Sequence, residues 1–480
     1  MPKFFKVLQK YPQTFWISNT MELFERWAWY GMFMILALYL TGSVDTGALG
    51  FTQAQKGIMM GTVVALLYFL PVITGAIADK FGYKKVLITA YIVMALGYVL
   101  MGYLSSYYAV FLAFIFLAIG AALFKPVISA CIAKTTTKET SSMGFGIFYM
   151  MVNLGAFIGP IFASKLRSSS WNLVFLMSAT VILINLLLVL IFFKEPAREQ
   201  NNTSLADSIK IVFKNILLAL SDRKFLFFLI IIIGFWTMYN QLFYTLPVFI
   251  DQWMDTSIVY DTLYSIWPWF AEKVSNGQGA INPEMLTNID AMYIVLFQVL
   301  ISYAIMKLKP LHAMIGGFFV ASIGIGLTFM FSNPMYLFVT ILVFGLGEMA
   351  SSPKISEYIG RIAPKDKVAL YMGCSFLPMA GGNFFAGLLS GNVYQKMSDK
   401  VSLLQFDLKS KGIIVPELSD SFTQNDLFAK ASEVLNMDNA GITEYLWNTY
   451  NPGNIWMVFT GIGITTVVVL FLYDRFVLSK

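Results

Sequence analysis

Stretches of about 20 mostly apolar residues follow one another along almost the whole chain. A helix of that length rises 1.5 Å per residue and crosses a hydrocarbon core of about 30 Å. The sequence therefore predicts an all-α membrane protein with about twelve transmembrane helices. The apolar segments fall near residues 13–41, 54–78, 84–104, 107–133, 142–165, 171–193, 224–250, 288–307, 311–331, 335–361, 367–392 and 453–477.

Composition agrees with a lipid environment. Hydrophobic residues make up 58% of the 480 residues and charged residues only 12%, whereas a soluble domain is about one quarter charged. The net charge of +6 is not gathered into a basic run with interleaved aromatic residues, so we expect no nucleic-acid partner. The first apolar segment carries charges and lacks a small-residue cleavage site, so we expect the N-terminus to be retained.

The residues that usually bind metals or form disulfides are scarce. Cys131 and Cys374 lie in or near apolar segments of opposite halves, and their spacing indicates packing rather than a metal site or a disulfide. His312 lies in a short connection and has no companion histidine. We therefore expect no metal, no cofactor and no enzymatic activity.

Lysine and arginine in the short loops predict the orientation, because cytoplasmic loops are enriched in them. Lys165 and Arg167 are an exception on the opposite side. The pattern predicts a multi-pass protein of the cytoplasmic (inner) membrane with both termini in the cytoplasm. The basic residues on the predicted cytoplasmic side are Lys3, Lys6, Lys10, Lys80, Lys84, Lys85, Lys134, Lys138, Arg198, Lys210, Lys214, Arg223, Lys224, Lys307, Lys309, Lys365, Lys367, Arg475 and Lys480.

A polar stretch divides the chain into two halves. Residues 195–223 form a predicted cytoplasmic linker, in which apolar residues from 205 to 217 recur at helical spacing. Residues 1–194 and 224–480 are then two six-helix bundles, the arrangement of transporters that bind their substrate near the bilayer midplane. The outer loops 251–287 and 393–452 are long, and each could be an interfacial cap or a folded appendage.

Three charged residues lie inside the first apolar segment. Glu22, Glu25 and Arg26 share one helical face, although each charge is costly in hydrocarbon. They could be a buried ion network that only holds helices together. Alternatively, two carboxylates beside one arginine leave a net negative site that can take up a proton.

Two further charges lie within apolar segments. Lys125 precedes Pro126, which removes a backbone hydrogen bond and tends to kink a helix. An intrahelical cap or a snorkelling lysine is the alternative interpretation. Glu348 is a buried carboxylate of the second half. A zwitterion could therefore bridge a positive first half and a negative second half.

Several sequence blocks, in order, resemble one family. MELFERWAWYGMF resembles the ExxER signature of the proton-coupled oligopeptide transporters of the major facilitator superfamily, and GFGIFYMMVNLGAFIGP resembles their FYxxxNxG signature. GAIADKFGYKK resembles the superfamily's loop between helices 2 and 3. LFKP, GEMASSPKISEYIGRIAP and MGCSFLPMAGGNFFAG resemble the family's helices 4, 10 and 11. The match spans both halves and omits chiefly the outer loops.

The resemblance implies a major facilitator fold and a role for each matching residue. Glu22, Glu25 and Arg26 would couple protons, and Arg26 with Lys125 would meet a peptide carboxylate. Glu348 would hold the peptide amino terminus. Further substrate-binding positions are Tyr30, Tyr68, Asn153, Asn240, Gln241 and Ser375, although Tyr68 and Asn153 could also make ordinary interhelical bonds. The expected cytoplasmic latch comprises Gly75, Asp79, Lys80, Gly82, Lys84 and Lys85.

The chain also departs from the family pattern. Trp29 stands where the family usually has tyrosine, Phe33 where an arginine is common, and Val127 where an asparagine follows Lys-Pro. Asn240 replaces an acidic residue and Ser375 replaces a tryptophan of the pocket wall. Residues 195–223 are too few for the two extra helices of many bacterial relatives. These differences predict a reshaped pocket.

The leading interpretation is a proton-coupled symporter that imports di- and tripeptides by alternating access. An alternative is proton-coupled transport of another small zwitterionic or anionic solute. A transporter-fold binding protein without flux is a third possibility, which only the long outer loops favour. The expected partners are the peptide, protons and the lipid bilayer, and because one chain suffices for alternating access we expect a monomer.

Overall fold

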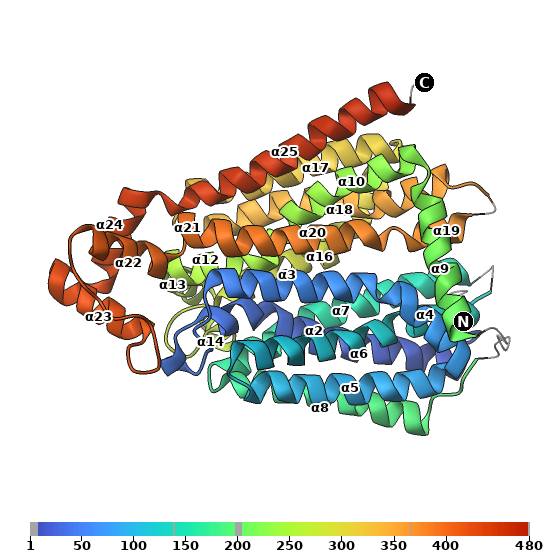
Figure 1. Ribbon diagram of the computed structural model, residues 1–480, viewed down its shortest axis with the longest axis horizontal. Coiled ribbons are helices and arrows are strands. Elements are labelled where there is room, and N and C mark those ends of the chain that lie inside the picture. Colours follow the sequence, from blue (N-terminus) through green and yellow to red (C-terminus); the bar gives the residue numbers. More distant parts are fainter. Residues whose placement is uncertain (1–7, 138–139, 197–203, 366, 479–480) are drawn as a thin grey trace. The chain divides into compact units, whose positions relative to one another are not determined.

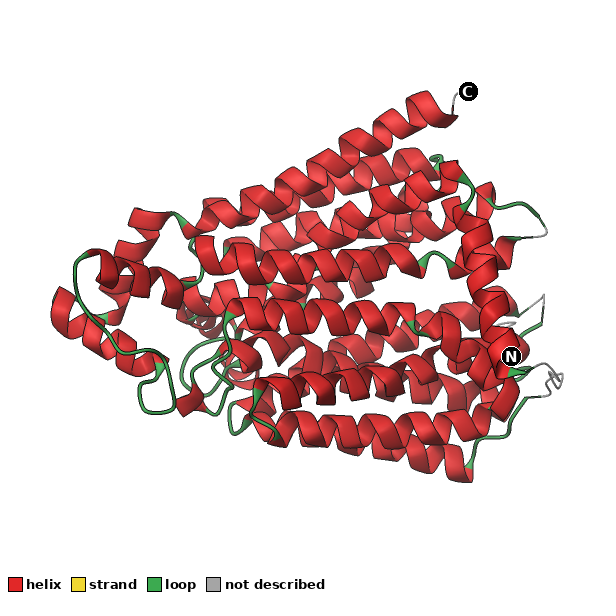
Figure 2. Ribbon diagram, viewed as in Figure 1, coloured by secondary structure: helices red, strands yellow, loops and turns green. Residues whose placement is uncertain are grey.

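A computed structural model describes residues 8–137, 140–196, 204–365 and 367–478. Within these ranges the regular secondary structure is helical and no strand is present beyond two isolated bridges (Figure 2). Every predicted apolar segment coincides with one helix or with consecutive helices. The all-α membrane fold predicted from the sequence is confirmed.

The described residues of the first part of the chain form eight main helices (Figure 1). The predicted surface helix of the linker is present as the last of them. The helices are α2 (Gln13–Thr41), α3 (Gln53–Phe69), α4 (Pro71–Phe81), α5 (Tyr83–Tyr103), α6 (Tyr107–Lys134), α7 (Ser141–Arg167), α8 (Trp171–Ile191) and α9 (Leu205–Leu220).

The second part contains the remaining long helices and both outer loops. The long helices and their short continuations are α10 (Arg223–Tyr239), α11 (Gln241–Tyr244), α12 (Leu246–Trp253), α16 (Ile289–Ala304), α17 (Pro310–Leu327), α18 (Tyr336–Ile362), α19 (Val368–Gly373), α20 (Phe376–Leu388), α21 (Tyr394–Met397) and α25 (Ile455–Tyr473). The outer segments fold into α13 (Ser257–Ile266), α14 (Pro268–Val274), α15 (Pro283–Thr287), α22 (Lys400–Ser410), α23 (Gln424–Leu435) and α24 (Asn439–Tyr450).

The chain divides into two compact units. Unit 1 comprises residues 1–33 and 63–222, and unit 2 comprises residues 34–62 and 223–480. Within unit 1, α5 packs against α6 and α8; within unit 2, α17 packs against α18 and α25. The break between residues 222 and 223 falls at the end of the predicted linker. The sequence order places residues 34–62 in the first predicted bundle, whereas they pack with unit 2 here. Their membership of the first bundle stays a prediction.

Ten helices among the described residues are long and apolar enough to cross a membrane, or eleven if α3 and α4 form one bent span. The two are inclined by 45°, where Pro71 begins α4. Helix α2 has 29 residues and is long enough, but its apolar stretch carries Glu22, Glu25 and Arg26. Length and apolarity alone therefore miss the helix with the most unusual charges.

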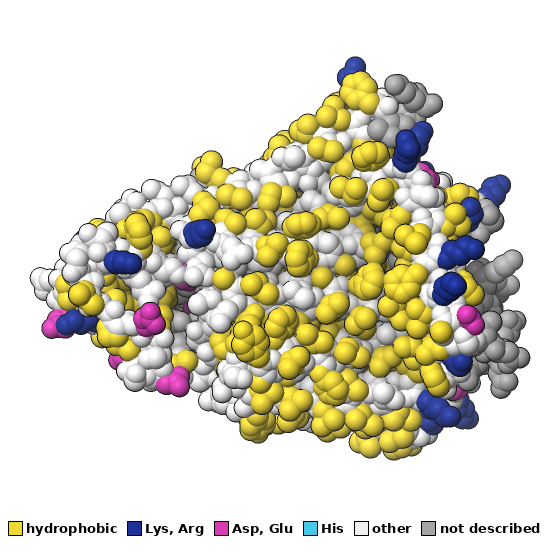
Figure 3. All heavy atoms as spheres, in the orientation of Figure 1, with side chains coloured by type: hydrophobic (Ala, Val, Ile, Leu, Met, Phe, Trp, Pro, Cys, Tyr) yellow, Lys and Arg dark blue, Asp and Glu magenta, His cyan; other side chains and the backbone are white. Residues whose placement is uncertain are grey.

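Large apolar side chains cover the exposed flanks of these helices. Leu187 and Ile191 of α8, and Val295 and Val299 of α16, are exposed although they are strongly hydrophobic. Figure 3 shows hydrophobic side chains over the helix flanks and Lys and Arg side chains near helix ends. This distribution suits helices that face lipid tails along their length and water at their ends.

Part of the predicted orientation and linker lies outside the described residues. This holds for Lys3, Lys6, Lys138, Arg198 and Lys480 and for residues 197–203 of the linker. The rest of the linker contains α9, whose first turn is capped by Ser204: its side chain accepts a hydrogen bond from the backbone of Asp207.

The outer segment 393–452 folds into helices that are joined by side-chain contacts. The Asp407 carboxylate of α22 accepts hydrogen bonds from the hydroxyls of Tyr445 (2.9 Å) and Tyr450 (3.0 Å) and pairs with Lys411 (2.8 Å). Burial, together with the bond to Asp407, raises the pKa of Tyr450 to about 12. One buried carboxylate therefore joins α22 to α24.

Candidate functional site

The charged face of α2 is buried in unit 1. The Arg26 guanidinium lies 3.3 Å from a Glu22 oxygen and makes a close ion pair with Glu25. Their exposed fractions are 6% for Glu22, 0% for Glu25 and 8% for Arg26. Spacings of three and four residues place the three side chains on one face, as predicted. The structure thus brings the predicted proton-coupling residues together.

Lys125 of α6 completes this cluster. Its ammonium nitrogen lies 4.4 Å from the centre of the Tyr68 ring of α3, a cation–π contact. The lysine also interacts electrostatically with Glu22, Glu25 and Arg26. When every group is ionised, two carboxylates and two cations balance, so the formal charge of the cluster is zero. One added proton gives it a net positive charge.

Pro126 leaves a backbone carbonyl of α6 without its usual donor. Proline has no N–H, so the Ala122 carbonyl loses the bond that residue 126 would supply. The Thr74 hydroxyl of α4 donates to that oxygen at 2.6 Å. A neighbouring helix therefore satisfies the freed carbonyl, as a helix within a membrane requires, and fixes the backbone next to Lys125.

Thr74→Val tests this contact. Valine has nearly the shape of threonine but cannot donate, so the Ala122 carbonyl becomes an unsatisfied buried acceptor, which costs about 1–3 kcal/mol. We expect a lower temperature of thermal unfolding for the purified protein. The matched control is Thr89→Val, because the exposed Thr89 hydroxyl donates to the Lys85 carbonyl of its own helix. Equal unfolding temperatures for the two variants would contradict the role of Thr74.

Tyr30 and Asn153 lie on α2 and α7 of the same unit. Tyr30 interacts electrostatically with Arg26. The Asn153 amide donates to the Tyr149 carbonyl of its own helix at 2.8 Å, which leaves its amide oxygen as an acceptor. Phe33, where the resemblance leads us to expect arginine, is stacked on Trp29 with ring centres 5.4 Å apart. Two stacked aromatic rings therefore lie where the family resemblance predicts a positively charged side chain.

The predicted latch residues surround the turn between α4 and α5. Gly82 has a φ of +100°, a conformation that glycine adopts without strain. The Asp79 carboxylate accepts a hydrogen bond from the Tyr83 hydroxyl at 3.2 Å. Glu195 accepts bonds from the first backbone N–H groups of α5, with 2.8 Å to Tyr83. A carboxylate at a helix N-terminus is favourable, and sequence reasoning missed Glu195.

Lys84 also joins the turn to the end of α8, because its ammonium group donates to the carbonyls of Leu190 (3.2 Å) and Phe193 (3.3 Å). The remaining predicted latch residues, Gly75, Lys80 and Lys85, lie on α4 or α5 of unit 1. A role of this turn as a latch between bundles stays a prediction.

Glu348 is buried in unit 2 with a second carboxyl group. It lies in the middle of α18 with 9% exposure, and Asp290 of α16 has 4% exposure. The Asp290 carboxyl group lies close to α18, because a Cβ at Gly345, one turn before Glu348, would be 3.0 Å from an Asp290 oxygen. Tyr239 of α10 hydrogen-bonds to Glu348. Sequence reasoning missed Asp290. An acidic residue at the start of an apolar segment was the signal available.

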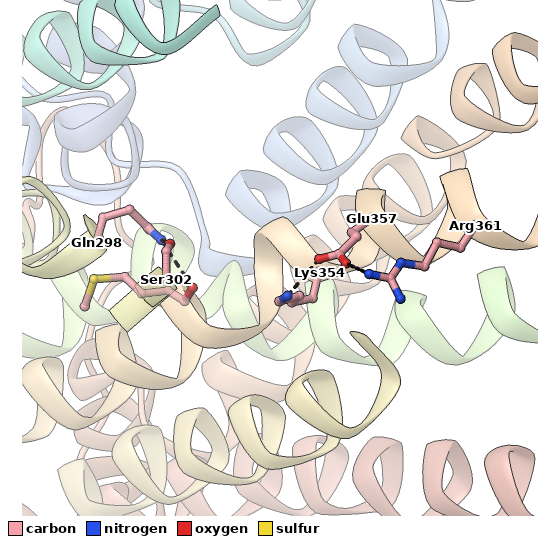
Figure 4. A network of polar contacts seen from close by, with 6 residues as sticks. Gln298, Ser302, Lys354, Glu357 and Arg361 are labelled. Atoms are coloured by element: carbon pink, nitrogen blue, oxygen red, sulfur yellow. Dashed lines mark hydrogen bonds and ion pairs between the residues drawn. The ribbon is translucent and has the colours of Figure 1, made fainter. Parts of the chain in front are cut away.

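In helix α18 a second proline frees a backbone carbonyl, which a side chain of another helix satisfies. Pro353 frees the carbonyl of Met349, and the Gln298 amide of α16 donates to that oxygen at 3.3 Å. One turn beyond, Glu357 pairs with Lys354 (2.7 Å) and Arg361 (2.5 Å) (Figure 4). The backbone of α18 is thus anchored to α16 next to Glu348.

The other predicted binding residues of unit 2 are bonded mainly to helix backbone. The Asn240 amide donates to Trp236 at 2.7 Å, and the Ser375 hydroxyl donates to Met372 at 2.7 Å. Gln241 is fully buried and donates to Thr237 (3.1 Å) and to Ala386 of α20 (3.3 Å). Gln241 therefore ties α11 to α20, and a substrate contact for it stays a prediction.

Two sequence comparisons match known proteins. A profile of the Major Facilitator Superfamily matches residues 20–271. The chain is 24% identical to the uncharacterized transporter YclF of Bacillus subtilis, over 77% of this chain and 86% of that protein. It is 31% identical to dipeptide and tripeptide permease A of Escherichia coli, but that alignment spans only 37% of this chain and 35% of the permease.

Solved transporter structures resemble the whole chain. A POT family transporter in complex with a thioalcohol-conjugated peptide superimposes with a TM-score of 0.72 and 17% identity, covering 98% of this chain and 99% of that one. The nucleoside transporter NupG superimposes with a TM-score of 0.67 and 14% identity, covering 96% and 99%. At these identities the likeness concerns the fold. Together with the permease match, it supports the resemblance to the oligopeptide transporters.

Proposed function

Because the chain belongs to the Major Facilitator Superfamily, we propose that it is a proton-coupled symporter that imports di- and tripeptides by alternating access. The observation that carries this proposal is the buried cluster in which Arg26 pairs with both Glu22 and Glu25 beside Lys125. The similarity to a dipeptide and tripeptide permease and to a POT family transporter supports the substrate class.

The balanced charge of the cluster suggests how a proton and a peptide bind together. A proton on Glu22 neutralises one carboxylate, so Arg26 and Lys125 then outweigh Glu25 alone. The resulting positive charge attracts a peptide carboxylate, and an arginine fork suits that group well. The peptide in turn favours the protonated cluster, because binding equilibria are reciprocal. Symport follows if only the empty and the doubly loaded carrier change conformation.

Glu22→Gln tests the proton site. Glutamine keeps the size and polarity of the side chain but cannot exchange a proton. We expect the variant to retain exchange of labelled dialanine across the membrane and to lose accumulation driven by a pH gradient, to less than about one tenth of the wild type. Glu433→Gln, at an exposed carboxylate paired with Lys430, is the control. Undiminished accumulation in Glu22→Gln would contradict the assignment.

A second candidate function is proton-coupled transport of another small zwitterionic or anionic solute. The aromatic stack of Phe33 on Trp29 favours it, because it removes one positive charge expected near the peptide carboxylate. The similarity to a nucleoside transporter also leaves other solutes open. Competition against labelled dialanine by amino acids, small carboxylates and nucleosides separates the two candidates.

The proposed setting is the cytoplasmic membrane, with both termini in the cytoplasm and a single chain as the working unit. Uptake of labelled dialanine into proteoliposomes tests the function as a whole. We expect accumulation with an inward proton gradient and its loss when a protonophore is added. If tight vesicles take up no dialanine and the protein does not bind it, the result favours the second candidate function. If the protein binds dialanine but the vesicles do not take it up, the result favours a binding protein without transport.

A further inference from the structure

A cavity lies in the outer segment of unit 2, among α21, α22 and the end of α24 (Figure 1). Its volume of about 350 Å³ is at the lower end of the roughly 300–1,000 Å³ of pockets that hold small molecules. The lining contains none of the predicted substrate-binding or proton-coupling residues. It consists of Gln395, Lys396, Ser402, Leu403, Phe406 and Tyr450.

The part of the lining on α21 offers positive charge and hydrogen-bond donors. Lys396 is exposed and takes part in none of the ion pairs found among the described residues. The side-chain oxygen of Gln395 accepts a hydrogen bond from the backbone of Ala54 at 2.9 Å, so the two N–H donors of the same amide are left for another acceptor. This part of the cavity suits an anionic group such as a phosphate.

The part of the lining on α22 and α24 is aromatic. Phe406 is 62% exposed, and its ring meets the Tyr450 ring edge to face with centres 6.2 Å apart. The Tyr450 hydroxyl donates to Asp407 at 3.0 Å, which fixes that ring. The Ser402 hydroxyl donates to Asp399 at 2.6 Å, so its oxygen is left to accept. Aromatic faces and an acceptor oxygen suit an ammonium group.

The cavity lies just beyond the apolar ends of two spanning helices. Helix α25 begins at Ile455, a few residues after Tyr450, and its 19 residues rise about 28 Å, nearly the thickness of the hydrocarbon core. Helix α20 continues through a π-helical turn that ends at Val393, shortly before Gln395 and Lys396. The headgroup layer adds about 5–7 Å on each side of the core, so both parts of the lining fall at its level.

The same two helices expose apolar side chains to the hydrocarbon core. Met457 in the first turn of α25 is 54% exposed, and Phe385 of α20 is 48% exposed. Leu403 adds an apolar side chain to the cavity itself. An amphiphile with its chains along these helices and its polar end in the cavity would therefore meet matching surfaces along its whole length.

We propose that this cavity binds the headgroup of a zwitterionic phospholipid. Lys396 and Gln395 receive the phosphate, and the rings of Phe406 and Tyr450 receive the ammonium group. The charges of the headgroup thus match the two parts of the lining, whereas an anionic headgroup without an amine would leave the aromatic part unused. This site is independent of the transported solute and of the Glu22 cluster, which belongs to the other compact unit.

The first experiment measures which lipids stay bound to the full-length protein. Native mass spectrometry follows the protein in mixed micelles that contain equal amounts of phosphatidylethanolamine and phosphatidylglycerol. We expect the wild type to retain phosphatidylethanolamine at least about threefold more than phosphatidylglycerol, because only the former has an ammonium group for the aromatic rings. Equal retention of the two lipids, or a preference for phosphatidylglycerol, would overturn the assignment.

Lys396→Gln tests the phosphate contact. The variant keeps a polar side chain but loses the positive charge, so we expect retained phosphatidylethanolamine to fall by about tenfold. The matched control is Lys409→Gln, which removes the same charge from an exposed lysine of α22 outside the lining. Equal retention by the two variants would overturn the role of Lys396. Thermal unfolding of both variants checks that they are folded.

Phe406→Leu tests the ammonium contact. Leucine keeps an apolar side chain but has no ring, so the variant should lose the preference for phosphatidylethanolamine over phosphatidylglycerol while it still retains lipid. A preference as large as that of the wild type would show that the ring does not hold the amine. Because Phe406 is largely exposed, we expect the temperature of thermal unfolding to change little.

A competition arm separates a membrane lipid from a soluble ligand with the same headgroup. Glycerophosphoethanolamine, which has no acyl chains, is added in large excess to the protein with bound phosphatidylethanolamine. We expect it to displace little lipid, because it makes no contact near Met457 and Phe385. Displacement would show that the cavity serves a soluble phosphate ester and would overturn the lipid assignment. None of these readouts depends on transport, so failure of dialanine uptake would leave this inference untouched.

Discussion

Arg26→Met is expected to abolish transport and to lower the free energy of unfolding by about 3–5 kcal/mol, because it leaves buried carboxylates without their counter-charge. Arg26 is the partner of both Glu22 and Glu25 in the structure, and Lys125 is another cation of the described residues that interacts with them. Thermal unfolding and dialanine uptake by the purified variant measure the two effects.

Two further variants separate charge from shape. Arg361→Met carries the same substitution at an exposed ion pair, whose loss should change stability little. The double variant Arg26→Met with Glu25→Gln removes one of the orphaned charges, so it should recover part of the lost stability and none of the transport. If Arg26→Met is as stable and as active as Arg361→Met, the cluster is neither a structural nor a functional centre.

Gly387→Val is expected to disrupt the contact between α3 and α20 in unit 2. A Cβ at Gly387 would lie 2.3 Å from the carbonyl oxygen of Gly57 and 2.5 Å from the Cα of Gly61. Glycines spaced by four residues on α3 face glycines with the same spacing at 387 and 391, which lets the backbones touch. Overpacking costs about 1–3 kcal/mol. This free energy corresponds to about a 5- to 150-fold fall in the population of molecules in which the two helices are packed.

Transport should fall by about the same factor if the packed arrangement is a required state of the cycle. The matched control is Gly461→Val on α25, where an added Cβ meets nothing within 4 Å. Initial rates of dialanine exchange and thermal unfolding of both variants measure the effect. Equal rates and unfolding temperatures for the two variants would show that the close contact is dispensable.

Lys56 also lies on α3, next to Gly57. Its buried position could not be predicted from the sequence. It lies in the first turn of α3, is fully buried, and donates to the Tyr244 carbonyl at 3.0 Å. A lysine at the edge of an apolar segment normally snorkels to water. Tertiary contacts place its ammonium group next to the Tyr244 carbonyl and 5.6 Å from the centre of the Tyr394 ring.

The sequence predicted the helices well because hydrophobicity is a local property. Each apolar segment became one helix or consecutive helices, and the amphipathic repeat after residue 204 became α9. The same reasoning found the face formed by Glu22, Glu25 and Arg26, because helical spacing fixes which side chains are neighbours. Resemblance to a family added Tyr68, whose ring does contact Lys125.

Contacts between distant segments were the part that the sequence did not predict. Thr74 and Gln298 are ordinary polar residues in the sequence, and they matter because Pro126 and Pro353 free carbonyls that happen to face them. Asp290 was passed over because an acid next to a predicted loop needs no buried partner. Its contact with Glu348 depends on how α16 packs against α18, which no local pattern specifies.

The central claim is that peptide and proton move together, and the most direct test is proton influx driven by peptide alone. Liposomes that contain the protein and a trapped pH indicator receive an inward gradient of dialanine, with no imposed pH difference and with the membrane potential clamped at zero. The account predicts internal acidification that depends on dialanine and is absent from liposomes that contain Glu22→Gln. Dialanine entry without acidification would contradict proton-coupled transport.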